Sequence, residues 1–272
     1  MKIAFIGGGN MASALIAGLA GKLAKGGDIH VVDPNADALA RLGEQHGVTT
    51  SLTIDSALAA SDVIVLAVKP QQMREVAAAL RAHVGASQPL ILSIAAGIRG
   101  ADLARWLGGY GKIVRTMPNT PALIGLGITG MVAMDGVSAP QKAAADSIMK
   151  AVGQTVWLDD EAQIDPVTAV SGSGPAYVFY FIEAMQQAAI EMGLSREQGR
   201  ELALATFVGA AQLAAQSDDA VPVLREKVTS KGGTTYAAIS SMEASGVKEK
   251  IIEAMKAAAA RGRELGDEMG RD

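Results

Sequence analysis

The chain has 272 residues, of which 49% are hydrophobic and 19% are charged, a balance typical of a folded globular protein of one or two domains. The formal net charge is -4 and no run of lysines and arginines occurs, so the sequence gives no indication of nucleic-acid binding. The absence of cysteine excludes disulfides, thiol catalysis and cysteine-based zinc sites, and the histidines lack ligand spacing, so we expect no metal site.

The chain begins with an apolar stretch that predicts a strand and not a targeting segment. Residues 2–6 form an apolar run that is too short and too interrupted for a signal peptide. No stretch of about eighteen apolar residues, free of charges and helix-breaking clusters, indicates a membrane span. We therefore expect a soluble protein of the cytoplasm.

A glycine-rich turn joins the first predicted strand to the first predicted helix. After residues 2–6, Gly7, Gly9 and Ala12 fit the G-x-G-x-x-G/A pattern of dinucleotide-binding domains. The first glycine of this pattern allows a tight turn, the second lets the backbone approach a pyrophosphate, and the small third residue lets the helix pack on the strand. Glycine-rich turns also follow strands for structural reasons, so the pattern needs support from its context.

An acidic residue ends the second predicted strand. Residues 29–32 read as a strand, and Asp33 follows at about the spacing where dinucleotide folds place an acid on the ribose 2′-hydroxyl. The alternative is that Asp33 belongs to a turn that caps the next predicted helix, residues 36–44.

Strands and helices continue to alternate through the first half of the chain. The run at 62–68 is rich in β-branched residues, as expected of a parallel strand that is buried on both faces. Further strands are predicted at 90–93, 112–115, 125–134 and 155–158, and helices at 72–80, 101–107 and 140–152. This alternation predicts a Rossmann-type, doubly wound α/β domain, in which ligands bind beyond the carboxyl ends of the strands. The segments at those ends are residues 7–10, Asp33, 67–70, 93–97 and 117–120.

Asn119 lies between two prolines in the segment 117–121, and these prolines stiffen its loop. Its amide is suited to a hydrogen bond with a nicotinamide or a ribose. An Asx-type turn without any ligand explains the same residues equally well.

From about residue 161 the pattern changes to helices alone. They are predicted at 164–170, 176–192, 196–216, 221–228, 237–242 and 247–265, and Ser195 with Gln198 forms a capping box for the third of them. The helix at 176–192 is apolar on nearly every side, which indicates burial, and an alanine-rich helical domain of this size can hardly bury it alone. We therefore expect association of subunits and two domains, 1–161 for the dinucleotide and 162–272 for substrate binding and dimerisation.

A turn of glycines and threonines precedes one of these helices. Gly232, Gly233, Thr234 and Thr235 place free backbone N–H groups and hydroxyls at the positively polarised N-terminus of the helix at 237–242. Such a terminus suits a small carboxylate. A cluster of this kind is more often only a helix cap, and the turn by itself does not decide between the two roles.

The residues that the helical half lacks narrow the choice of reaction. It contains no histidine, and neither half shows a Lys-x-x-Asn arrangement at a helix start, which a hydroxyacid dehydrogenase needs to take a proton from an alcohol. A cyclic imine fits better as a substrate, because its nitrogen is readily protonated in water. Its reduction then needs mainly positioning and electrostatics from the protein.

Six motifs, which follow one another in the family's order, resemble those of pyrroline-5-carboxylate reductase. They lie at residues 6–11, 67–70, 93–97, 117–121, 171–177 and 228–243. The resemblance covers the whole chain and implies reduction of 1-pyrroline-5-carboxylate to L-proline with NADPH or NADH, the last step of proline biosynthesis. It also implies homodimers of intertwined helical domains, often assembled into a decameric ring of five dimers, with each active site shared between two chains.

The resemblance also assigns residues to the site. Together with Asp33 and Asn119 from the strand-end segments, the expected cofactor-binding residues are Gly7, Gly8, Gly9, Asn10, Met11, Ala67, Val68, Lys69, Pro70, Ala95, Ala96 and Gly97. The expected substrate-binding residues are Ser171, Ser173, Gly232, Gly233, Thr234 and Thr235. In the family the turn binds the substrate carboxylate through backbone N–H groups, and Thr235 corresponds to a threonine that hydrogen-bonds the ring nitrogen. Because an alcohol is a poor acid, we expect Thr235, the predicted catalytic residue, to orient the imine rather than deliver its proton.

Two positions depart from the family pattern. Residues 53–55 replace an asparagine that contacts the adenosine ribose in many relatives. Asp33 stands where NADPH-preferring relatives often have Ser, Arg or Lys, and its charge repels a 2′-phosphate, with Arg41 the nearest downstream cation. We therefore predict that NADH is used appreciably.

Other functions remain open on the residues alone. A related imine reductase or a β-hydroxyacid dehydrogenase of similar architecture needs a lysine that faces the substrate, and Lys231 and Lys227 are the candidates near the turn. A non-catalytic dinucleotide-binding regulator has no need of a carboxylate-binding turn, so the intact threonine turn argues against it.

Overall fold

The structure is a computed structural model that describes residues 1–85 and 87–271. Its packing divides the chain into two compact units. The first comprises Met1–Ser173 and the end of the last helix from Ala257 onward, and the second comprises Gly174–Lys256. The sequence places the domain boundary between residues 161 and 162. The packing boundary falls later in the chain and returns the end of the last helix to the first unit.

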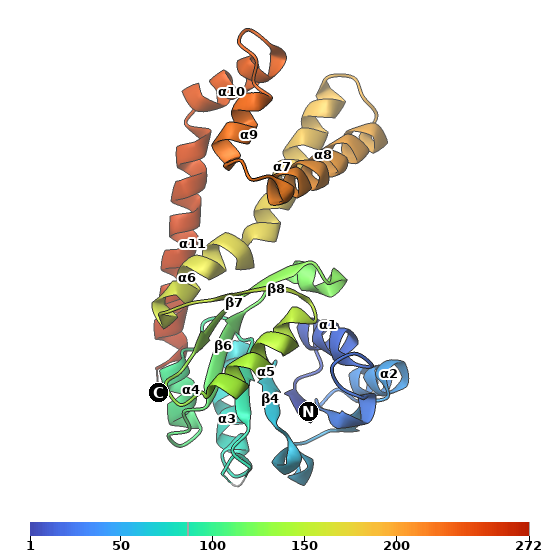
Figure 1. The fold of residues 1–272 in the computed structure, drawn as a ribbon, viewed down its shortest axis with the longest axis vertical. Coiled ribbons are helices and arrows are strands. Elements are labelled where there is room, and N and C mark those ends of the chain that lie inside the picture. The colour runs from blue at the N-terminus through green and yellow to red at the C-terminus, as the bar shows by residue number, and fades with distance from the viewer. Residues whose placement is uncertain (86, 272) are drawn as a thin grey trace. The chain divides into compact units, whose positions relative to one another are not determined.

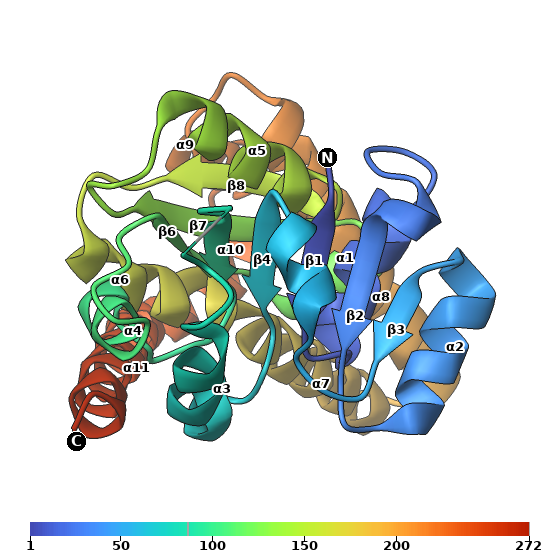
Figure 2. The ribbon, with the colours of Figure 1, turned by 90° about the horizontal axis from the view of Figure 1, so that it is seen from below.

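An eight-stranded sheet forms the centre of the first unit, with its strands in the order β3-β2-β1-β4-β5-β6-β7-β8. Figure 2 shows the strands side by side, with β3 at one edge and β8 at the other. Their bounds are β1 Ile3–Ile6, β2 Ile29–Val32, β3 Thr49–Ser51, β4 Val63–Leu66, β5 Leu90–Ser93, β6 Ile113–Met117, β7 Gly127–Ala133 and β8 Gly153–Trp157. All neighbours are parallel except β6 and β7. The predicted Rossmann-type α/β domain is confirmed.

Alternate residues of the central strands pack on opposite faces of the sheet. Ile3 and Phe5 of β1 belong to one buried apolar cluster, and Ala4 and Ile6 belong to the other. The first cluster receives residues from α1 (Asn10–Leu19), α2 (Ala36–His46) and α5 (Ala139–Lys150), and the second from α3 (Met73–Leu80) and α4 (Gly100–Trp106). Because helices cover both faces, the central strands β1 and β4 are apolar and buried along their whole length.

After β6 the chain no longer alternates strand and helix in the way that makes neighbouring strands parallel. Only the short 3₁₀ helix Thr120–Ile124 joins β6 to β7, and a connection of this length returns the chain antiparallel. β8 then pairs parallel to β7 after the crossover helix α5. The sequence located both strands but did not give their direction. It missed β3, whose Thr and Ser residues carry no apolar signal.

The second unit consists of helices. They are α7 Gly174–Glu191, α8 Arg196–Gln216, α9 Val221–Lys227, α10 Thr234–Ala244 and the beginning of α11, which runs Val247–Met269. The predicted capping box at the start of α8 is confirmed. Ser195 N–H donates to Gln198 Oε1 at 2.9 Å, and Gln198 N–H donates to Ser195 Oγ at 3.2 Å. Figure 1 shows α8 folded back along α7 as its packing partner.

Large apolar side chains remain exposed in the second unit. Phe179 is 65% exposed and Tyr180 is 72% exposed, whereas the buried residue of α7 is the small Ala189. The unit has too few layers to cover α7 on every side. Burial of this apolar helix is therefore not achieved within one chain, and its surface indicates association with another chain.

Two kinds of feature are absent from residues 1–85 and 87–271. None of the helices there combines the length and the apolarity that crossing a membrane requires. No group of three or more His, Asp or Glu side chains in the same residues is arranged to hold a metal ion.

Candidate active site

The glycine turn after β1 requires a residue without a side chain. Gly7 has φ +104°, and a Cβ at this position would lie 2.6 Å from the carbonyl oxygen of Ala67. The Gly7 N–H donates to Val32 O at 2.8 Å. The turn is therefore packed between the ends of β2 and β4, and a larger residue would push these ends apart.

Asp33 holds the glycine turn from the end of β2. Its Oδ2 accepts the Gly8 N–H at 2.6 Å, and its Oδ1 accepts the Asn35 N–H at 2.8 Å. Asn35 in turn caps α2, because its Oδ1 accepts the Ala38 N–H at 3.1 Å. Both oxygens of the Asp33 carboxylate thus already hold a backbone donor.

A cavity of about 780 Å³, which we call the cofactor cavity, opens beside the glycine turn. Its lining comes from the ends of β1, β2 and β4, from the segment after β3 and from α3. The lining residues are Ile6, Gly7, Gly9, Val32, Asp33, Pro34, Asn35, Leu52, Thr53, Ile54, Ala67, Val68, Lys69, Gln72, Glu75, Val76 and Ala79. The cavity brings together the predicted cofactor residues Gly7, Gly9, Asp33, Ala67, Val68 and Lys69.

A second cavity, of about 390 Å³, adjoins the first and shares Gly9, Asp33 and Asn35 with it. We call it the α2 cavity, because much of its lining comes from that helix. The lining residues are Gly8, Gly9, Asn10, Ser13, Asp33, Asn35, Ala38, Arg41, Leu42 and Gln45. It contains the two further predicted residues Gly8 and Asn10, together with Arg41.

The remaining predicted cofactor residues line neither of these cavities. They are Met11, Pro70, Ala95, Ala96, Gly97 and Asn119. Ala95 and Ala96 lie on the loop after β5, where Ala95 is buried and Ala96 is exposed, and Gly97 lines a third cavity. Their assignment to the cofactor stays a prediction.

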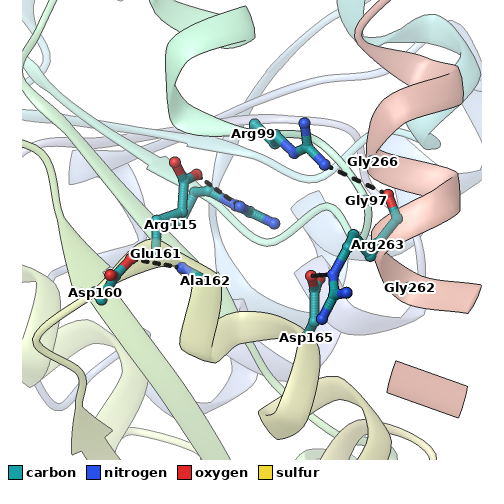
Figure 3. Close-up of a pocket in the computed structure, with 10 residues that line it drawn as sticks. All are labelled: Gly97, Arg99, Arg115, Asp160, Glu161, Ala162, Asp165, Gly262, Arg263 and Gly266. Atoms are coloured by element: carbon teal, nitrogen blue, oxygen red, sulfur yellow. Dashed lines mark hydrogen bonds and ion pairs between the residues drawn. The ribbon is translucent and has the colours of Figure 1, made fainter. Parts of the chain in front are cut away.

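The third cavity, of about 310 Å³, is dominated by charged side chains (Figure 3). Glu161 Oε1 accepts two hydrogen bonds, one from Arg115 Nη1 and one from the Gly100 N–H, each 2.6 Å long. Arg115 is only 5% exposed. One carboxylate thus joins the middle of β6 to the start of α4. Sequence reasoning missed this pair, although a charged residue at the end of the apolar run 112–115 is a signal that points to it.

The same cavity shows why the end of α11 belongs to the first unit. Arg99 Nη2 donates to Asp267 Oδ1 at 2.6 Å and to Arg263 O at 3.4 Å. Arg99 precedes α4, and the two acceptors lie on α11. These contacts hold the last turns of α11 against the loop that follows β5, and Figure 3 draws the contact of Arg99 with Arg263.

Asn119 is 9% exposed, and both ends of its amide have partners within the chain. Its Nδ2 donates to Ser171 O at 3.1 Å, and its Oδ1 accepts the Ile128 N–H at 3.0 Å. Ser171 lies in the π-helical turn Thr168–Gly172, and its hydroxyl donates to Val167 O at 2.9 Å. Asn119 therefore joins the loop after β6 to the segment with Ser171, a role that the sequence reasoning did not include.

In the second unit, the threonine turn leads into α10 without a side-chain cap. Gly232 has φ +77°, and the Gly233 N–H donates to Ser230 O at 3.0 Å, as in a type II turn. Gly233 is the N-cap residue and makes no side-chain hydrogen bond. The helix begins at Thr234, earlier than predicted, so both exposed threonines belong to its first turn. The N–H groups of that turn have no acceptor in their own helix, and a small anion would satisfy them.

Two family models match the chain. Residues 161–265 match the model described as pyrroline-5-carboxylate reductase dimerisation. Residues 2–97 match the model described as NADP oxidoreductase, coenzyme F420-dependent. The first match covers the whole second unit, and the second covers the glycine turn, Asp33 and both cavities beside them.

Curated relatives match along nearly the whole chain. The pyrroline-5-carboxylate reductase of Pseudomonas aeruginosa is 46% identical over 270 residues, which cover 99% of this chain and 98% of the relative. The pyrroline-5-carboxylate reductase of Escherichia coli K12 is 38% identical over 258 residues, which cover 93% of this chain and 94% of the relative.

Solved structures of the same kind share the fold. The pyrroline-5-carboxylate reductase of Coxiella burnetii has a TM-score of 0.92 at 40% identity and covers 97% of this chain and 98% of its own. The Plasmodium falciparum pyrroline carboxylate reductase, solved with NADP bound, has a TM-score of 0.86 at 30% identity and covers 98% of each chain. A prephenate dehydrogenase from A. aeolicus, at 13% identity and a TM-score of 0.52, is similar in fold alone.

Proposed function

This chain belongs to the pyrroline-5-carboxylate reductase family, and we propose that its cofactor cavity and its threonine turn carry out the family's reaction. The enzyme is an oxidoreductase that reduces the cyclic imine 1-pyrroline-5-carboxylate to L-proline with NAD(P)H, the last step of proline biosynthesis. The observation that supports the residue assignment best is the uncapped start of α10, because it offers backbone donors to the carboxylate that this substrate carries.

The residues of the cofactor cavity fit a nicotinamide dinucleotide. An added Cβ at Gly9 would meet no protein atom within 4 Å, so the backbone there is open to a pyrophosphate. α1 begins at the next residue, Asn10, and its N-terminus favours negative charge. When bound, the cofactor supplies the hydride. We assign residues 67–70 and 95–97 to the ribose and the nicotinamide.

The threonine turn is assigned to the substrate carboxylate. Gly233, Thr234 and Thr235 supply backbone N–H groups at the start of α10, and Gly232 gives the turn the positive φ that aims them. We include Ser171 and Ser173 in the substrate site on the strength of the family motif. We propose that residues 162–272 bind the substrate and dimerise, and the match of residues 161–265 to the dimerisation model supports this.

Thr235 is assigned to the imine nitrogen, which it orients by a hydrogen bond. The nitrogen is protonated in water before the hydride reaches the carbon, so no side chain of the chain needs to act as a strong acid. The hydroxyl fixes the ring relative to the hydride donor, and such positioning is a large part of the rate enhancement that a protein can give.

A hydroxyacid dehydrogenase of similar fold is the second candidate, and the positions of the lysines disfavour it. Lys227 forms an ion pair with Asp219 on the connection before α9, so its ammonium group is engaged. Lys231 is exposed on the type II turn itself. A catalytic lysine is instead expected in a desolvated position where its pKa can fall toward neutrality.

We propose the assembly and the location of the enzyme from the same family membership. The chain carries the family's dimerisation region, and the exposed apolar side chains of α7 support a homodimer through the helices of the second unit. We extend this to a decamer of five dimers and to the cytoplasm, where NAD(P)H is available. Sedimentation equilibrium of the purified protein tests the assembly, with a monomer at micromolar concentration as the contradicting result.

The reaction is tested with purified protein, racemic pyrroline-5-carboxylate and either NADPH or NADH, followed at the nicotinamide absorbance. We expect oxidation of the cofactor and formation of proline in equal amounts. If neither NADPH nor NADH is oxidised, the assigned activity is contradicted. Turnover of a β-hydroxyacid in place of the imine would favour the second candidate.

A further inference from the structure

The loop that follows β5, residues 94–99, carries the residues 95–97 that we assign to the ribose and the nicotinamide. The sheet anchors this loop near both ends. The Ile94 N–H donates to Leu66 O at 3.2 Å, and Ile98 is 1% exposed within one of the two apolar clusters. Residues 95–97 are two alanines and a glycine, so few side-chain atoms of their own hold them in place.

The last turns of α11 lie against this loop. Gly97 has φ +74°, and a Cβ at this position would lie 3.7 Å from Leu265 Cβ, an ordinary van der Waals distance. A Cβ at Gly266, which is buried, would lie 3.2 Å from Arg99 Nε, so the Arg99 side chain passes over α11 at this glycine. α11 therefore contacts both the loop and the residue that ends it.

The Arg99 side chain spans one turn of α11. Its Nη2 donates to Arg263 O at 3.4 Å and to Asp267 Oδ1 at 2.6 Å, four residues further along the helix. Figure 3 shows the guanidinium group directed toward α11. The contact with Asp267 is a charge-assisted hydrogen bond, and both side chains are partly exposed, so its strength is that of a surface ion pair.

Glu161 holds the next residue along the chain. Its Oε1 accepts the Gly100 N–H at 2.6 Å at the start of α4. In the last turn of α4, Arg105 Nη2 donates to Gly270 O at 2.7 Å, which ties this helix to the end of α11 as well. The end of the loop at Arg99 is thus held by side chains that lie outside the loop.

From these contacts we propose that Arg99 is a positioning residue for the cofactor and that Asp267 holds it in this role. The ion pair fixes the end of the loop, and the loop places residues 95–97 against the nicotinamide half. A misplacement of about 1 Å is enough to slow a reaction strongly, so contacts outside the site affect it. The inference rests on the assignment of residues 95–97 in the proposed function, and it adds the side chains that keep them in place.

Two adjacent acids on α11 provide the test and its matched control. Asp267 pairs with Arg99, whereas Glu268 pairs with Arg261 of its own helix at 2.8 Å, and both pairs are exposed. Asp267→Ala removes a contact to the loop, and Glu268→Ala removes a contact within α11. NADPH and 2′,5′-ADP are titrated calorimetrically into each full-length variant without substrate. The second probe represents the adenosine half of NADPH and lacks the nicotinamide.

For Asp267→Ala we expect about two- to fivefold weaker binding of NADPH, the range of an exposed ion pair, and unchanged binding of 2′,5′-ADP. Glu268→Ala should leave both affinities unchanged. With saturating NADPH, kcat for pyrroline-5-carboxylate should fall in Asp267→Ala while KM for the imine stays near that of the wild type.

Charge reversal separates this ion pair from a general loss of structure. Arg99→Asp places a like charge beside Asp267, and Asp267→Arg places a like charge beside Arg99. Each change alone should weaken NADPH binding by about tenfold. The double variant restores a pair of unlike charges and should recover most of the NADPH affinity.

Three results would overturn the inference. They are equal losses of both probes in Asp267→Ala, a loss of NADPH affinity no larger than in Glu268→Ala, and losses that add in the double variant. The titrations contain no pyrroline-5-carboxylate, so their outcome is independent of the reaction. A protein that shows the predicted affinities but no turnover would contradict the proposed activity alone. A reductase whose variants bind NADPH as the wild type does would contradict this inference alone.

Discussion

The two units of the chain differ in how far a single chain buries their large apolar side chains. The first buries apolar clusters on both faces of its sheet, and every residue of β1 is buried. The second buries small residues such as Ala189, Gly199 and Ala203, and it exposes Phe179 and Tyr180. The difference shows that Gly7, Asp33 and Ala67, which we assign to the cofactor, are held by the packing of their own chain. The threonine turn, in contrast, lies on helices whose apolar surface calls for a second chain.

The largest effect is expected where the first unit is most tightly packed. Gly7→Ala places a Cβ 2.6 Å from a backbone oxygen at a φ that L-residues rarely adopt, so the turn must open. We expect cofactor affinity to fall by about a hundredfold or more, together with a lower melting temperature. Fluorescence titration with NADPH and thermal denaturation measure the two changes.

Gly9→Ala is the matched control for Gly7→Ala. Its Cβ meets no protein atom within 4 Å, so the melting temperature should stay near that of the wild type while cofactor binding weakens. Equal melting temperatures for the two variants would contradict the packing argument at Gly7.

The corresponding change in the second unit should affect the chemistry and not the fold. Thr235 is exposed, and we propose that its hydroxyl binds the imine nitrogen of the substrate. Loss of one well-placed polar contact in Thr235→Ala should then lower kcat/KM for the imine by about ten- to a thousandfold. Steady-state kinetics measure the loss. Thr235→Ser keeps a hydroxyl and should retain most of the activity. Unchanged kinetics in Thr235→Ala would show that the turn acts only as a helix cap.

The third prediction concerns the exposed apolar surface of α7. Phe179→Ser should weaken subunit association by about 2 kcal/mol, roughly thirtyfold in the dissociation constant, because large aromatic residues dominate such interfaces. Analytical ultracentrifugation over a range of concentrations measures the shift. Leu23→Ser alters an exposed apolar residue of the first unit, and an equal weakening in that variant would remove the contrast between the units.

A smaller effect is expected at the ion pair between Arg115 of β6 and Glu161. Glu161→Ala leaves Arg115, which is 5% exposed, without its carboxylate, but Glu161 is itself 25% exposed as a side chain. Water therefore reaches the site, and we expect a loss of about 1 to 2 kcal/mol in the free energy of unfolding rather than the full cost of a buried unpaired charge. Urea denaturation measures it, and the loss should not depend on protein concentration.

Asp267→Ala breaks a pair of the same length that is more exposed on both sides, between Arg99 and Asp267. It should cost less than about 1 kcal/mol. A larger loss in Asp267→Ala than in Glu161→Ala would show that burial does not decide the strength of these two contacts.

Much of the fold and part of the site could be predicted because they depend on local patterns. Parallel strands place their carboxyl ends at one edge, so the strand pattern alone predicts that Gly7, Asp33 and Ala67 line one cavity, as they do. The start of α8 followed from the Ser195 capping box. These are signals carried by a few neighbouring residues.

The rest depends on contacts between residues far apart in the chain, which a local pattern does not carry. Asn119 forms hydrogen bonds with Ser171 and Ile128, and Glu161 forms hydrogen bonds with Arg115 and Gly100. The direction of β7 depends on the geometry of a short connection. Arg41 and Asp33 line one cavity because of the way α2 packs, and the sequence shows only the charge of Arg41.

The central claim is that the first unit holds the cofactor and the threonine turn of the second unit holds the substrate. The most direct test measures two quantities, NADPH affinity and kcat/KM for pyrroline-5-carboxylate. Both are determined in the same preparations of the wild type, Gly7→Ala and Thr235→Ala. We predict that Gly7→Ala loses both, whereas Thr235→Ala keeps the NADPH affinity of the wild type and loses only kcat/KM. A parallel loss of NADPH affinity in Thr235→Ala, or wild-type turnover in that variant, would contradict this division of the site.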